Sequence, residues 1–145
     1  MQTMILSMSA KDVAAVAAIE KRCFLDAWGE ESVLATLSRK DFYGFCAVLD
    51  GEIVGYVCGT ILFENAEVLR IAVLDTQRRK GIGAMLLDTF LSSANEQGAE
   101  RVFLEVRAQN AAAIGLYASR GFENIRVREH YYAHGENAVE MIKTL

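Results

Sequence analysis

The chain has 145 residues, which is long enough for one domain with a proper core and too short for two ordinary ones, so we expect a single domain over residues 1–145. Its 52% of hydrophobic and 23% of charged residues are typical of a globular protein and exclude a disordered chain. The net charge of −4 argues against a nucleic-acid-binding protein, and no apolar run approaches the roughly 20 residues that cross a bilayer.

The N-terminus and the cysteines indicate a cytoplasmic protein. No signal peptide is evident, because the first residues hold only a brief apolar run without a basic stretch before it. Cys23, Cys46 and Cys58 lack a Cys-x-x-Cys spacing and lie among apolar residues. We expect them to be reduced core residues without a metal or redox role.

The first half of the chain predicts two helices followed by strands. Ser9 and Asp12 form an N-cap signature, and apolar residues at helical spacing predict a helix over about 10–24. A second, short helix is expected over Glu30–Ser38. Asp50-Gly51 is a hairpin signal between two of the strands. Strands are expected over Phe42–Leu49, Ile53–Phe63 and Val68–Leu74, and Met4–Ser7 can be counted as an earlier one.

A basic, glycine-containing turn follows the third of these strands. Residues 78–84 read RRKGIGA and open a helix over Gly81–Glu96. Unpaired N–H groups and the positive end of the dipole make the start of a helix an anion site, and three adjacent cations strengthen it. A Gly-x-Gly-x-x-Gly dinucleotide motif and a Walker A motif are both absent. We expect a phosphate-bearing ligand; the alternative is a surface turn with a solvated run of charge.

The second half predicts one more strand and helix and a final pair of strands. A strand over Val102–Arg107 precedes a helix that Asn110 caps and Gly121 closes. The last strands, near Glu123–Tyr131 and Ala138–Ile142, flank a turn that contains His134. We assign no catalytic role to either histidine of the chain, His130 or His134. The order of elements predicts an α/β domain with a mixed sheet.

Two residues of this half are candidates for acid–base chemistry. Glu105 interrupts an apolar strand, so it is expected to be partly buried, and burial makes a carboxylate a better base. The alternative for Glu105 is a structural ion pair, for example with Arg70. Tyr117 lies on the apolar face of its helix, where core packing is the ordinary explanation. Gly115 in the same helix suggests either a close approach by another group or tolerance of a weak helix.

The segment LEVRAQNAAAIGLYASRGF (104–122) resembles the second signature of the GNAT family of N-acetyltransferases, in its ribosomal-protein-alanine N-acetyltransferase (RimI) type. The basic turn is similar to the pyrophosphate loop of that family, and REHYYAHGENAVEM (128–141) is similar to its C-terminal motif. The resemblance spans Ile5 to Met141. It implies the acyl-CoA N-acyltransferase fold, a mixed and mostly antiparallel sheet of six to seven strands flanked by four helices.

The resemblance also implies the roles of individual residues. Glu105 is implied to be the general base for the acceptor amine, and Tyr117 the general acid for the departing CoA thiolate. Acetyl-CoA is the implied co-substrate, with no metal. The implied cofactor-binding residues are Ile71, Ala72 and Val73 for the pantetheine arm, Arg79, Lys80, Gly81, Ile82, Gly83 and Ala84 for the pyrophosphate, and Asn110 near the thioester.

The acceptor implied by the resemblance is the N-terminal alanine of a small-subunit ribosomal protein. We place Trp28, Arg70 and Tyr131 at the acceptor site; of Tyr131 and Tyr132, at most one is expected to face the groove. The carboxylates of Asp26, Glu30 and Glu31 could receive a basic peptide, or serve only as acids near a helix start. Two alternatives stay open: an acetyltransferase for lysine, polyamines or other small amines, and a CoA-binding regulatory module without catalysis. We expect a monomer or a weak dimer.

Overall fold

The computed structural model describes residues 2–132 and 135–145, so the predicted turn residue His134 lies outside the described residues. Within those ranges one seven-stranded sheet has the order β1-β2-β3-β4-β5-β7-β6, and every neighbouring pair is antiparallel except β4 and β5. The strands are β1 (Met4–Ser7), β2 (Phe42–Leu49), β3 (Glu52–Leu62), β4 (Asn65–Val73), β5 (Arg101–Arg107), β6 (Glu123–Arg128) and β7 (Ala138–Thr144). The helices are α1 (Val13–Cys23), α2 (Glu30–Leu37), α3 (Ile82–Glu96) and α4 (Ala111–Ser119), with short 3-10 turns η1 (Ala10–Asp12) and η2 (Asp75–Gln77). The expected mixed, mostly antiparallel sheet with four helices is confirmed.

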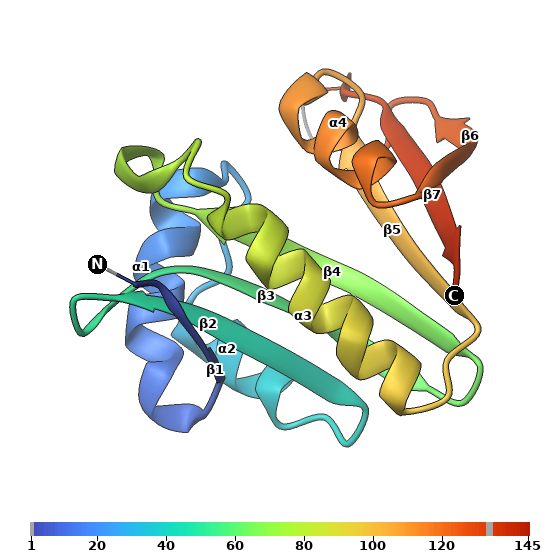
Figure 1. Cartoon of the computed structure of the whole chain (residues 1–145). Helices are drawn as coiled ribbons and strands as arrows, with labels where there is room; N and C mark the ends of the chain where they lie inside the picture. The colour runs from blue at the N-terminus through green and yellow to red at the C-terminus, as the bar shows by residue number, and fades with distance from the viewer. Residues whose placement is uncertain (1, 133–134) are drawn as a thin grey trace.

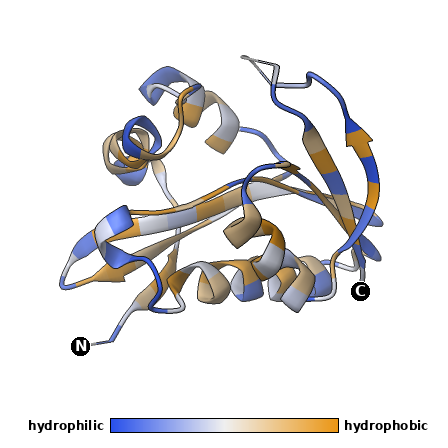
Figure 2. Ribbon diagram, turned by 90° about the horizontal axis from the view of Figure 1, so that it is seen from above, coloured by the Kyte–Doolittle hydropathy of each residue, from blue (hydrophilic) through white to orange (hydrophobic). Residues whose placement is uncertain are grey.

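Helices cover both faces of the first half of the sheet (Figures 1 and 2). On one face α3 lies across β2, β3 and β4, with Ile82, Leu86 and Phe90 at 0–2% exposure. Their spacing of four residues places them on one side of the helix. On the other face α1 and α2 pack against Tyr56 and Cys58 of β3. The sheet therefore lies between two hydrophobic layers.

The sheet divides between β4 and β5, where Figure 1 shows the two strands diverging. They pair in parallel only from Asn65↔Arg101 to Val68↔Leu104. The next residue, Leu69, is an extra residue opposite β3, because Cys58 pairs with Arg70 and Gly59 with Val68. Such a bulge bends its strand. The bend begins where the β4–β5 pairing ends, and it opens a cleft between the two halves of the sheet.

The second half of the chain departs from the sequence prediction at the end of β6. We expected that strand to continue to Tyr131, but it ends at Arg128. His130 then adopts a φ of 53°, which breaks the extended backbone. Tyr131 and Tyr132 therefore lie in a loop, and strand alternation does not govern the directions of their side chains.

No helix in the described ranges is both long and apolar enough to cross a membrane.

Candidate active site

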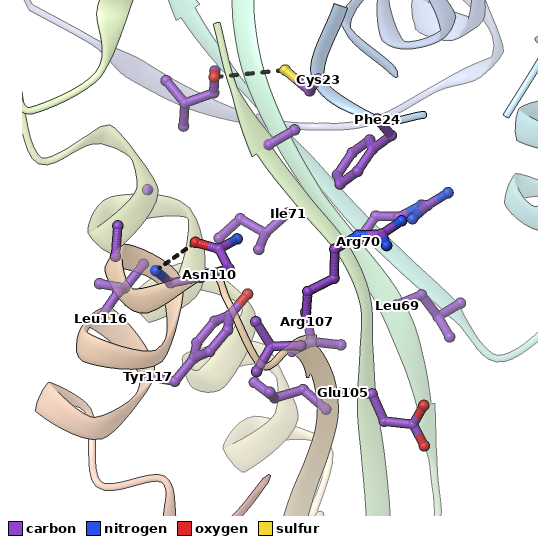
Figure 3. A pocket seen from close by; sticks show the side chains of 18 of the residues that line it. Cys23, Phe24, Leu69, Arg70, Ile71, Glu105, Arg107, Asn110, Leu116 and Tyr117 are labelled. Carbon is purple, nitrogen blue, oxygen red and sulfur yellow. Dashed lines mark hydrogen bonds between the residues drawn. The ribbon is translucent and has the colours of Figure 1, made fainter. Parts of the chain in front are cut away.

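A pocket of about 870 Å³ occupies the cleft between β4 and β5. Its walls come from β4, from the turn before α3, from the end of β5, and from α4. Figure 3 shows Ile71 on the β4 wall facing Asn110 and Tyr117, which α4 and its cap contribute from the other side. The lining residues that the sequence pointed to are Arg70, Ile71, Ala72, Val73, Arg79, Gly81, Ile82, Gly83, Glu105, Asn110, Tyr117 and Tyr131.

The β4 wall offers unpaired backbone groups. Beyond Val68, β4 pairs with β3 on one side and with no strand of residues 2–132 and 135–145 on the other. The N–H and C=O groups along that free edge of Leu69–Val73 therefore face the pocket or solvent, apart from the Val73 carbonyl, which accepts from side chains. An extended ligand with amide groups can pair with such an edge as an added strand.

The turn after β4 has the geometry of an anion site. Gly81 is the N-cap of α3 with a φ of 79°, and Arg79 also has a positive φ of 66°. Glycine adopts this left-handed backbone freely, whereas arginine does not. The first N–H groups of α3 point out of the helix toward the pocket end that Gly81, Ile82 and Gly83 line.

The three cations of this turn differ in position. Arg79 lines the pocket, as predicted. Lys80 does not, and its Nζ donates to Gln77 Oε1 at 2.9 Å. Ala84 is likewise not among the lining residues. Arg78 lines the pocket, and its Nε donates to the Val73 carbonyl at 3.0 Å.

The α4 wall holds the phenol of Tyr117. The helix begins at Asn110, whose Oδ1 accepts from the Ala113 N–H at 3.1 Å, as the predicted cap requires. Tyr117 is buried against Phe122, with the ring centroids 5.8 Å apart in an edge-to-face arrangement. Burial, and then the nearby Tyr132, raise the pKa of Tyr117, so its hydroxyl stays protonated at neutral pH. A Cβ at Gly115 would meet no atom of the described residues within 4 Å, so none of those residues approaches closely there.

The carboxylate of Glu105 lies at the pocket wall with 19% of its side chain exposed. Its ion-pair partner is Arg128, whose Nε lies 3.1 Å from Glu105 Oε1, so the suggested pair with Arg70 was wrong. Glu105 pairs with Arg128 because Glu105, Glu140 and Arg128 lie side by side on the neighbouring strands β5, β7 and β6. Glu105 stands opposite Glu140, and two like charges in that position repel. Arg128 bridges them, because its Nη2 also lies 3.0 Å from Glu140 Oε2.

Comparisons with known proteins agree with this arrangement. The acetyltransferase (GNAT) family profile matches residues 13–122. The chain belongs to the acetyltransferase (GNAT) family. An N-alpha-acetyltransferase of Sulfurisphaera tokodaii is 41% identical over 114 residues, which cover 70% of this chain and 68% of that protein. The [ribosomal protein bS18]-alanine N-acetyltransferase of Escherichia coli is 30% identical over 128 residues, covering 88% of this chain and 86% of that one.

A solved structure extends the agreement to the whole fold. The crystal structure of the ribosomal-protein-S18-alanine N-acetyltransferase from Escherichia coli superimposes with a TM-score of 0.92 at 29% identity. The match covers 99% of this chain and 94% of that chain. The GNAT fold and the resemblance to the RimI type, both expected from the sequence motifs, are thereby confirmed, as is an enzyme of the N-acetyltransferase class.

In this GNAT domain Arg70 contacts the helical layer that covers the sheet. Its Nε lies 3.4 Å from Glu20 Oε2, and its guanidinium stacks on the rings of Phe24 and Trp28 at 4.3 and 4.7 Å. Ordinary alternation would place Arg70 on the same face as Val68, but the bulge at Leu69 turns it to the α1–α2 face.

The expected acceptor residues divide into those that line the pocket and those that do not. Tyr131 and Tyr132 both line it, with ring centroids 5.1 Å apart, so the expectation that one of them packs elsewhere was wrong. Trp28 is not a lining residue and instead stacks on Arg70. Asp26 is already paired with arginines, and Glu30 and Glu31 occupy the first turn of α2.

The residues that support Arg70 and close the cleft carry no recognisable motif in the sequence. Glu20 is fully buried; its carboxylate accepts from the Trp28 N–H at 2.9 Å and from the Tyr56 hydroxyl. Burial is the main cause that raises the pKa of Glu20. Its position four residues after Val16 on an otherwise apolar helix face was the available signal. Arg107 pairs with Asp26 at 3.4 Å and with Glu136, and it stacks on Tyr132 at 4.3 Å.

Two of the three cysteines lie in the core, and the third lines the pocket. Cys46 and Cys58 are buried thiols, and burial raises the pKa of each to about 12. Cys23 departs from the expected core position, because it lines the pocket between Val73 and Arg78. In the described ranges, no three or more histidine, cysteine, aspartate or glutamate side chains are grouped so that they could hold a metal ion.

Proposed function

We propose that this protein transfers the acetyl group of acetyl-CoA to the α-amine of a protein N-terminus by direct transfer. The observation that carries this proposal is the cleft between β4 and β5. One wall is an unpaired strand edge that leads to an anion-binding turn, and the other walls hold a carboxylate, Glu105, and a protonated phenol, Tyr117. Their combination suits acyl transfer from a long, phosphate-bearing thioester.

The residues present fit acetyl-CoA. The free edge at Ile71–Val73 matches the two amides of the pantetheine arm, and the N-terminus of α3 with Arg79 matches a pyrophosphate. Asn110 and Gly115 belong to the α4 segment that contributes the wall facing β4. When bound, acetyl-CoA supplies an acyl group activated as a thioester.

The two titratable side chains divide the proton transfers. Glu105 accepts the proton that the acceptor amine loses as its nitrogen bonds to the acetyl carbon, directly or through one water. Tyr117 donates its hydroxyl proton to the sulfur as the carbon–sulfur bond breaks. The Glu105 carboxylate is the main cause that raises the pKa of Tyr131. The ion pair with Arg128 fixes the base at the wall of the cleft.

An α-amine suits a single carboxylate base better than a lysine side chain does. An α-amine with a pKa of about 7.7–8.0 is roughly one-tenth neutral at pH 7, whereas lysine near 10.4 is almost fully protonated. The difference of about 2.5 units corresponds to roughly 3.5 kcal/mol. Relatives named as acetyltransferases of N-terminal amines support the same acceptor class. Within it we propose the N-terminal alanine of a small-subunit ribosomal protein, as for the E. coli relative.

The test is mass spectrometry of reactions between acetyl-CoA and two peptides. One begins Ala-Arg-Tyr with a free α-amine, and the other is blocked at its N-terminus but carries a lysine. Acetylation confined to the free α-amine is the expected result. Modification of the blocked peptide alone would move the protein to the lysine acetyltransferases. The absence of any product, despite binding of acetyl-CoA, would favour a small-amine acceptor or a regulatory role.

A further inference from the structure

A second pocket of about 480 Å³ lies on the sheet face that α1 and α2 leave uncovered toward β5, β6 and β7. Thr60 and Leu62 at the end of β3 and Phe103 on β5 contribute to its wall. Charged side chains dominate the rest of its lining: Asp41, Glu67, Glu105, Arg126, Arg128 and Glu140.

Most of these charges are neutralised inside the protein. Arg126 and Arg128 pair with Glu140 at 3.1 and 3.0 Å, and Arg128 also pairs with Glu105. Asp41 pairs with Arg39 at 2.9 Å. Glu67 is different: in residues 2–132 and 135–145 no lysine, arginine or histidine nitrogen lies within ion-pair distance of its carboxylate. The pocket therefore has a surplus of negative charge at Glu67.

The second pocket adjoins the cleft of the proposed reaction. Glu67 and Glu105 line both cavities and form the boundary between them. Glu67 stands opposite Phe103 in the parallel β4–β5 pairing, two residues before Glu105. The spacing between strands and the rise per residue then place the Cα atoms of Glu67 and Glu105 roughly 8 Å apart on one face of the sheet. Glu67 is exposed to solvent at this boundary. Desolvation, and next the Glu105 carboxylate, raise the pKa of Glu67, whereas the charge of Arg39 lowers it.

We propose that this second pocket receives the second residue of the acceptor peptide and that Glu67 selects a basic side chain, lysine or arginine, at that position. The inference rests on the proposed function, because it requires an acceptor α-amine at Glu105. A second residue begins one 3.8 Å step from the first, so a long basic side chain spans the remaining distance to Glu67. Leu62 and Phe103 offer apolar surface for the methylene groups of that side chain.

In this proposal Glu67, and not the acids between α1 and α2, selects the acceptor peptide. Asp26 is held by Arg70 and Arg107, and neither Glu30 nor Glu31 lines the cleft or the second pocket. Glu67, by contrast, is an unpaired carboxylate beside the proposed base. A cationic partner would restore its charge balance.

The experiment compares the peptides Ala-Arg-Tyr and Ala-citrulline-Tyr, which differ by one charge at nearly constant shape. For the wild type we expect kcat/KM to be about fivefold higher with arginine, the ratio that an ion pair of about 1 kcal/mol gives. In Glu67→Gln this ratio falls to about one. Glu64→Gln is the matched control, because Glu64 is an exposed acid of the β3–β4 turn that lines neither pocket; it keeps the wild-type ratio.

The outcomes separate the two proposals. Equal use of both peptides by the wild type, or an arginine preference that survives Glu67→Gln, overturns the role of Glu67 and leaves the proposed function standing. Acetylation of neither peptide by the wild type, with acetyl-CoA binding intact in calorimetry, overturns the proposed function and this inference together. A ratio that collapses in Glu67→Gln alone supports both.

Discussion

Among single residues, Glu105 gives the sharpest test of the proposed chemistry. Glu105→Gln keeps the shape and most hydrogen bonds of the side chain but removes its ability to take a proton. We expect kcat to fall by about 100-fold or more, the usual contribution of a general base, while the dissociation constant of acetyl-CoA stays within about twofold. Steady-state kinetics and calorimetry measure the two quantities. Turnover close to wild type would remove Glu105 from the role of base.

Tyr117 is tested by removal of one oxygen atom. Because Tyr117→Phe preserves the edge-to-face contact with Phe122, we expect the fold to persist and acetyl transfer to slow by about 10-fold or more. Burial raises the pKa of the phenol, so its protonated form persists above pH 10 and the wild-type rate should show no loss from Tyr117 ionisation between pH 7 and 9. A pH–rate profile of both forms checks this, and equal rates in the two proteins would contradict the acid role.

Among the elements, β4 and its bulge position the site, and Gly59 of β3 lies directly opposite. A Cβ on Gly59 would stand 2.0 Å from the Glu67 carbonyl oxygen and 2.7 Å from the Phe90 ring. Backbone cannot yield cheaply, so we expect Gly59→Ala to lower the free energy of unfolding by about 2–4 kcal/mol. Gly29→Ala is the control: no atom lies within 4 Å of its new Cβ, and the loss of glycine at the N-cap of α2 should cost no more than about 1 kcal/mol. Urea titrations of the three proteins give the comparison; equal midpoints for both variants would show that the bulge tolerates the methyl group.

The same element shows where prediction from the sequence succeeds and where it stops. The existence of β4, the turn at Gly81 and the helix that Asn110 caps follow from local patterns, and the structure contains all of them. The bulge at Leu69 left no local signal, because it depends on how β4 meets β3 and β5. The partners of Arg70 could therefore not be predicted, because the bulge decides on which face of the sheet its side chain lies.

Long-range order explains the remaining misses. Arg128 reaches Glu105 across an intervening strand, which requires the order β5-β7-β6 that no short motif encodes. The loop conformation at His130 likewise ended β6 three residues before the predicted boundary, and so placed Tyr131 and Tyr132 together in the cleft.

In the whole molecule, the two halves of the sheet join at one end and diverge at the other (Figure 1). Near the open end, Asp26 of the α1–α2 loop reaches Arg107 of β5 at 3.4 Å, and Arg107 reaches Glu136 in the loop before β7. This chain of ion pairs connects the loops that border the cleft. Because Arg107 also stacks on Tyr132, it couples the positions of these loops to the pocket wall.

Breaking that connection should loosen the acceptor side of the cleft without disturbing the acetyl-CoA side. For Asp26→Asn we expect the peptide KM to rise about three- to fivefold, since partly exposed ion pairs contribute up to about 1 kcal/mol, while the acetyl-CoA dissociation constant is unchanged. Salt screens such pairs, so with the Ala-citrulline-Tyr peptide, which lacks the charge proposed to bind Glu67, the wild-type KM should rise between 50 and 500 mM salt and that of Asp26→Asn should not. Asp75→Asn, which breaks the exposed pair with Arg22 away from the pocket lining, should behave as wild type. An equal salt response in all three proteins would mean that the ion pairs at Arg107 do not hold the acceptor loops.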